Sequence, residues 1–213
     1  MNEANVSAII SATAGISGVI LGNSFVAIKE WLKDSKKEEK ESAYLAILVV
    51  SHLERFANGC LAVAQDDGTS EGLPAGNDNE TYHTTVAAPS FEPLDIKVEW
   101  KVLPKELMYE IFQISDDKEN VDNRISGTEH YSDPPEYFEY FWMRRREYAE
   151  LGLKVSAIAN KLRKHAEMPI KATPPDEWDR DELLKDVVTK ISLATSAHEK
   201  RQLELLEKIN NSV

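Results

Sequence analysis

Residues 4–28 read ANVSAIISATAGISGVILGNSFVAI and contain no charged side chain. A helix rises about 1.5 Å per residue, so a helix of this length can cross the roughly 30 Å hydrocarbon core of a bilayer. Charged residues begin at Lys29 and continue densely to Glu41. The sequence therefore predicts a transmembrane helix in residues 1–28.

Two other interpretations of this stretch stay open. It contains many Ser, Thr and Asn residues among its aliphatic ones, which also suits a helix buried in a protein core or in an oligomer. A cleaved signal peptide is the third alternative. It is the weakest of the three because the stretch is preceded by Glu3 and by no basic residue.

Small residues recur at four-residue spacing within the stretch, and Gly18 and Gly22 form a GxxxG pair. Such a face lets two helices approach closely, and close packing drives helix association in lipid. We therefore expect a homo-oligomer. The predicted association face comprises Ser11, Gly15, Gly18 and Gly22.

Five lysines follow the uncharged stretch between Lys29 and Lys40, and no lysine or arginine precedes it. Because basic residues stay on the cytoplasmic side, the sequence predicts a single-pass protein with most of the chain in the cytoplasm. The single cysteine, Cys60, lies in an apolar helical stretch and has no partner for a disulfide, which permits a reducing compartment.

The formal net charge is −12, and acidic residues dominate residues 66–140. Nucleic-acid binding requires a positive field that neutralises phosphates, so no nucleic-acid partner is predicted. The cluster from Arg144 to Arg146 is a local exception. Its three side chains point about 100° apart on a helix, and we expect them to pair with the chain's own acidic region.

The pattern beyond the stretch predicts a mainly α protein, a helical bundle with one long irregular loop. Residues 29–66 form a juxtamembrane amphipathic helix that ends at Asp66-Asp67-Gly68. Residues 67–103 form an irregular acidic loop, rich in Gly and Pro, in which a short strand near Trp100 is possible. Residues 104–213 form a helical domain that packs with residues 38–66.

Four helices are expected within residues 104–213. The first two are short and cover residues 104–115 and 117–125. The third begins after Asp133 at Pro134 and ends near His165, and the fourth runs from Pro175 to about Asn210 with apolar residues at near-heptad spacing.

No catalytic, cofactor-binding or metal-binding residue is predicted. Phosphate-binding, dinucleotide-binding and nucleophile-elbow motifs do not occur in the sequence. The one Glu-x-x-His match, Glu80 to His83, falls in the expected loop, and an ordinary polar loop explains it better than a metal site.

These observations favour a non-enzymatic membrane-anchored scaffold, adaptor or regulator whose cytoplasmic helices bind protein partners. The alternative is an oligomeric membrane-active effector that assembles through its N-terminal helix, and an enzyme with a dispersed site is a third hypothesis. Aromatic residues are frequent at binding hot spots, so the candidate partner contacts are aromatic: Tyr82, Trp100, Tyr137, Tyr140 and Trp142.

Overall fold

The computed structural model describes residues 3–78, 80–169 and 178–210, but not the side chains of residues 3–28, Asp34 and Glu38. The described chain is mainly helical, which confirms the expected mainly α class. Its elements are α1 (Glu3–Gln65), β1 (Thr69–Ser70), β2 (Leu73–Pro74), two 3-10 helices η1 (Pro93–Asp95) and η2 (Trp100–Val102), α2 (Lys105–Glu129), α3 (Phe138–His165) and α4 (Arg180–Asn210).

The central element of the bundle is α3, which packs against α1, α2 and α4. Its buried stripe includes Tyr148, Leu151, Val155 and Leu162, at the three- and four-residue spacing that places side chains on one helix face. The main core joins this stripe to the second half of α1 and to α2, and a smaller cluster joins Leu184, Val187 and Ile191 of α4 to α1 and α3.

The first helix is a single 63-residue element whose second half belongs to the bundle core. Within the described residues, Lys29–Gln65 is long and apolar enough to cross a membrane, judged by length and composition alone. A core helix passes the same test, and Leu45, Val49, Leu53 and Phe56 are buried against the bundle. The predicted span in residues 1–28 lies outside the residues whose side chains the structure describes.

The end of α1 agrees with the sequence pattern. The helix stops at Gln65, directly before Asp66-Asp67-Gly68. Gly68 has a φ of +80°, and a Cβ at this position would lie 2.4 Å from the ring of Phe141. Only glycine combines this left-handed conformation with so close an approach.

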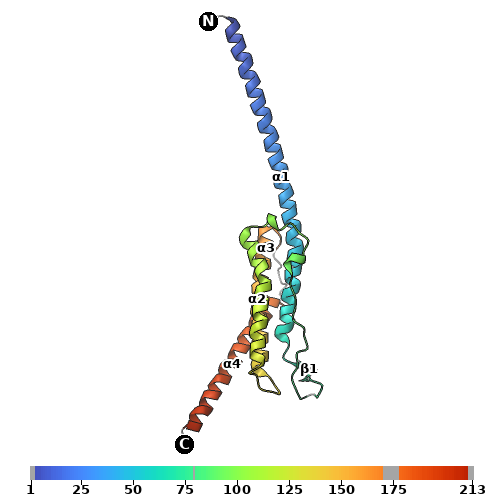
Figure 1. The fold of residues 1–213 in the computed structure, drawn as a ribbon, viewed down its shortest axis with the longest axis vertical. Coiled ribbons are helices and arrows are strands. Elements are labelled where there is room, and N and C mark those ends of the chain that lie inside the picture. The colour runs from blue at the N-terminus through green and yellow to red at the C-terminus, as the bar shows by residue number, and fades with distance from the viewer. Residues whose placement is uncertain (1–2, 79, 170–177, 211–213) are drawn as a thin grey trace.

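The long loop contains two short 3-10 helices and a small hairpin, not the strand considered near Trp100. It runs back along α1 (Figure 1) and contributes Phe91, Ile96 and Leu103 to the main core. The ring of Phe91 packs 5.8 Å from that of Phe56. The loop has an irregular backbone but is well packed, because its apolar residues cover a side of α1 in the way that another helix would.

Two expected short helices are one continuous helix, α2. The expected break near Asp116 is wrong because Ile114, Val121 and Ile125 continue the same buried stripe and no glycine or proline lies between Ile114 and Ile125.

The third helix begins later than its proline motif suggests, at Phe138 and not at Pro134. Residues 134–136 form a turn, since a residue that precedes proline disfavours helical geometry. For α4, the expected start at Pro175 lies outside the described residues. Its described part begins at Arg180, where the Asp179 carboxylate accepts backbone N–H groups from Asp181 and Glu182.

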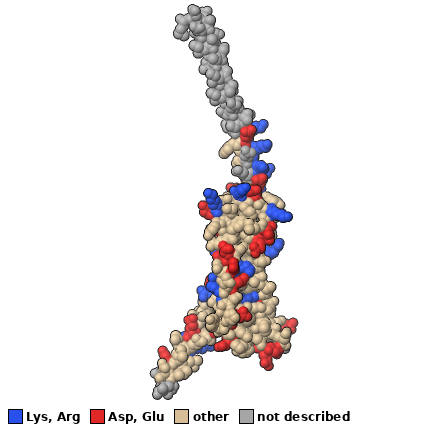
Figure 2. Space-filling view, in the orientation of Figure 1, with Lys and Arg blue, Asp and Glu red and all other residues tan. Residues whose placement is uncertain are grey.

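The molecule is elongated, and its two terminal helices project from opposite ends of the bundle (Figure 1). The first half of α1 extends beyond one end, and the last turns of α4 extend beyond the other. Figure 2 shows Lys and Arg residues interleaved with Asp and Glu where α1 leaves the bundle.

Candidate functional site

The end of α1 is held by two arginines of α3. Arg144 donates from Nη1 to Oδ2 of Asp66 over 2.7 Å, and both side chains are buried. Arg145 donates from Nε to the carbonyl oxygen of Ala64 over 3.0 Å, satisfying a carbonyl in the last turn of α1. The expected pairing of the arginine cluster with the acidic region is thus confirmed for Arg144.

Asp66 also organises the long loop. Its carboxylate accepts the backbone N–H of Gly68, Thr85 and Val86 and the hydroxyl of Thr85. Burial alone raises the pKa of this carboxyl, but the hydrogen bonds from Thr85, Val86, Gly68 and Arg144 outweigh it and hold the pKa below its usual range. Asp66 therefore stays ionised, and its hydrogen bonds link the end of α1 to α3 and to the loop.

A second charged cluster fixes the start of α4. Glu54 on α1 accepts from Arg163 of α3 over 2.7 Å and from Arg180 of α4 over 2.6 Å. Arg180 also donates to Oγ of Ser156 over 2.7 Å, and Ser156 donates to Asp181 over 2.8 Å. Because this network sets where α4 begins, it also sets the direction in which α4 leaves the bundle.

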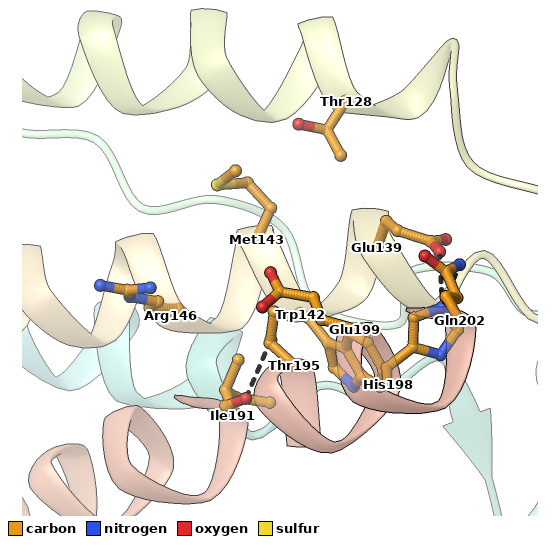
Figure 3. A pocket seen from close by; sticks show the side chains of 10 residues that line it. All are labelled: Thr128, Glu139, Trp142, Met143, Arg146, Ile191, Thr195, His198, Glu199 and Gln202. Atoms are coloured by element: carbon orange, nitrogen blue, oxygen red, sulfur yellow. Dashed lines mark hydrogen bonds and ion pairs between the residues drawn. The ribbon is translucent and has the colours of Figure 1, made fainter. Parts of the chain in front are cut away.

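The candidate site is a pocket of about 400 Å³ between the end of α2, the start of α3 and the middle of α4 (Figure 3). We call it the α3–α4 pocket. Trp142, Met143 and Ile191 supply its apolar walls. The remaining lining residues are polar or charged: Thr128, Glu139, Arg146, Thr195, His198, Glu199 and Gln202.

The acidic residues of the pocket come from two helices. Glu139 stands on α3, and Glu199 reaches from α4 toward α3 (Figure 3). Glu139 lies 3.7 Å from Nε2 of His198, whose ring packs edge-on against Trp142. Within the described part of the chain, neither carboxylate forms an ion pair with Lys or Arg, whereas Arg146 is paired with Glu150 at 2.8 Å.

The apolar stripe of α4 continues past the pocket into solvent. Leu184, Val187 and Ile191 are buried at the start of the helix. The end of the helix, residues 201–210, is exposed throughout. Its large apolar side chains are 59–62% exposed: Leu203, Leu205, Leu206 and Ile209.

The predicted aromatic contacts lie in three places, and all of them are half-buried. Trp142 lines the α3–α4 pocket. Tyr137 and Tyr140 meet Tyr82 of the loop at a smaller pocket of about 150 Å³. Trp100 packs edge-on against Phe112, with ring centroids 4.9 Å apart, which explains it as an anchor of the loop. The predicted association face, Ser11, Gly15, Gly18 and Gly22, lies outside the residues whose side chains are described.

Sequence reasoning named Trp142 but missed the pocket around it. Glu139 and Glu199 were not predicted, because nothing in the sequence brings these two residues together. The near-heptad stripe of α4 was a usable signal. It predicts that residues 195, 198 and 202 share a face with Leu184 and Ile191.

Two features limit the chemistry of the described chain. In the ranges that the structure describes, no group of three or more His, Cys, Asp or Glu side chains is placed to hold a metal ion. Cys60 is buried, and burial raises the pKa of its thiol to about 12. A thiol in this state is a poor nucleophile.

Comparison with known proteins adds no relative: no family model, curated protein or solved structure matches this chain. Its function is therefore inferred from its own residues and geometry.

Proposed function

We propose that this chain is a non-enzymatic membrane-anchored scaffold, adaptor or regulator whose helical bundle binds a protein partner in the cytoplasm. The observation that carries the proposal is the opposite placement of two apolar segments. The uncharged residues 4–28 lie at one end of the elongated molecule, and the exposed Leu and Ile residues of α4 lie at the other (Figure 1).

The anchor is supported by length and flanking charge. The uncharged stretch is long enough to cross a bilayer, and the lysines between Lys29 and Lys40 follow it directly. A segment rich in charged residues, most of them exposed where their side chains are described, then separates it from Leu45, the first residue of α1 that is described as buried. This arrangement would hold the bundle clear of the lipid surface.

The binding role is supported by the exposed end of α4. Clustered exposed apolar side chains on a soluble surface commonly mark interaction sites. This cluster continues a helix stripe that is already used for packing inside the bundle, and it borders a pocket with a tryptophan wall.

The test is fractionation of cells that express either the full chain or a chain that starts at Glu30. The expected result is that only the full chain stays with carbonate-washed membranes and dissolves in detergent. If both chains are soluble, the anchor is wrong, and residues 4–28 form a core or an interface.

The second candidate function is an oligomeric membrane-active effector, favoured by the Gly18 and Gly22 pair. It predicts growth arrest on expression that Gly18→Leu and Gly22→Leu abolish. Under the scaffold function these substitutions change cross-linking between copies and leave growth unaffected.

A further inference from the structure

One face of α4 continues from the α3–α4 pocket to the exposed end of the helix. Successive residues of a helix are rotated by about 100°, so Gln202, Leu205, Leu206 and Ile209 follow Ile191 and His198 on the same side. Leu203 points away from this face. A helix laid along Leu205, Leu206 and Ile209 would reach the pocket at Gln202.

The charge of the α3–α4 pocket indicates what it accepts. Its apolar walls are Trp142, Met143 and Ile191, and the carboxylates of Glu139 and Glu199 stand at them without a Lys or Arg ion pair in the described residues. Arg146 also lines the pocket, but its charge is paired with Glu150. A lysine or arginine side chain fits both the apolar walls and the carboxylates, because its apolar stem can lie on the tryptophan while its charged end meets the carboxylates.

We propose that the α3–α4 pocket and the adjoining apolar face of α4 bind an amphipathic helix of a protein partner, with a lysine or arginine of that helix entering the pocket. The proposal rests on the proposed function and names its docking surface. Apolar residues of the partner, one helical turn apart, pack on Leu205, Leu206 and Ile209.

The alternative occupant of this face is a second copy of this chain. Self-association is therefore one of the outcomes that the test distinguishes.

The test measures binding of two fluorescent probe peptides to the full chain in a non-ionic detergent. Both peptides are amphipathic helices of about 18 residues with one leucine stripe, flanked by lysine in the first and by glutamate in the second. The full chain is expected to bind the lysine peptide at least about tenfold more tightly than the glutamate peptide.

Charge reversal locates the binding site. The double variant Glu139→Lys with Glu199→Lys is expected to reverse the preference between the two peptides. The control Glu106→Lys with Glu119→Lys makes the same change in net charge at exposed positions of α2 and should keep the preference. An equal effect of both double variants would mean that overall charge alone determines the preference, and this result would overturn the proposal.

A second pair of variants tests the apolar part. Leu205→Glu should weaken binding of the lysine peptide at least about tenfold, whereas Leu203→Glu, about 160° away around the same helix, should leave it nearly unchanged. Equal losses for the two variants would overturn the proposed face. Concentration-dependent self-association that Leu205→Glu abolishes would instead assign this face to a second copy.

The outcomes are separable from those of the fractionation test. A soluble chain that still shows the charge-reversed preference contradicts the membrane anchor and supports the proposed docking surface. An anchored chain without peptide preference supports the anchor and contradicts the docking surface.

Discussion

Arg144 and Asp66 are 78 residues apart in sequence and form a buried ion pair with 2.7 Å between Nη1 and Oδ2. The pair joins α3 to the end of α1, and the long loop closes over it through Thr85 and Val86. Three segments distant in sequence therefore depend on one carboxylate.

Removal of one partner of this pair should destabilise the fold strongly. Asp66→Asn leaves the Arg144 charge buried without its counter-ion, and we expect a loss of about 3–5 kcal/mol in the free energy of unfolding. Chemical denaturation measures it. The double variant Asp66→Asn with Arg144→Met should lose less than the sum of the two single changes, and simple additivity would show that the residues do not interact.

A fall in pH should remove the stabilisation that the ion pair of Asp66 with Arg144 provides. The folded pKa of Asp66 is lowered, so the unfolded chain takes up a proton at higher pH than the folded chain does. The stabilisation is complete above the unfolded pKa of about 3.9 and is lost as the pH falls through the folded pKa. The difference in unfolding free energy between wild type and Asp66→Asn should therefore shrink between pH 5 and the folded pKa. A constant difference across this range would contradict the assignment.

The helices were largely predictable because their signals are local. Asp66-Asp67-Gly68 marks the end of α1, and the periodic stripes of α3 and α4 mark their buried faces. The sequence pattern places the start of α3 four residues too early. The N-cap motif favours a helix there, but a proline disfavours helical geometry in the proline that precedes it.

The candidate site was much less predictable. Glu139 and Glu199 line the same pocket only because α4 packs against α3, and the direction of α4 depends on the contacts of Glu54 with Arg163 and Arg180. Such relationships between distant residues leave no periodic trace in one sequence. The packing of the loop was missed for the same reason, because Phe91 and Ile96 are recognised as core residues only when the folded chain places them beside α1.

Two glycines in helices should respond to alanine with opposite signs. A Cβ on Gly152 would lie 3.0 Å from Cβ of Cys60 and 3.0 Å from a methyl group of Leu184, so Gly152→Ala should destabilise the bundle by about 1–3 kcal/mol. A Cβ on Gly127 would meet nothing within 4 Å, and Gly127→Ala should stabilise by up to about 1 kcal/mol. Thermal unfolding followed by circular dichroism compares the two variants, and the same sign for both would contradict this packing of Gly152.

The thiol of Cys60 should be inert in the folded protein. It is buried, and its pKa is raised to about 12, so a disulfide reagent at neutral pH should react only when the bundle opens. The rate of colour release in the presence and absence of denaturant measures this. Ala157→Cys, at an exposed position of α3, provides the matched control and should react at once. Fast reaction of the wild-type protein would place Cys60 at an accessible surface.

The end of α4 should be dispensable for folding, since its large apolar side chains are 59–62% exposed and contribute little burial. It continues a helix whose first half is packed, and propagation of an existing helix requires no new nucleus. Truncation after Gln202 should therefore lower the helical signal while shifting the melting temperature of the bundle by less than about 2 °C. A large shift would mean that Leu205, Leu206 and Ile209 pack on the bundle in solution. In that case the face proposed for a partner helix is already occupied by the chain itself.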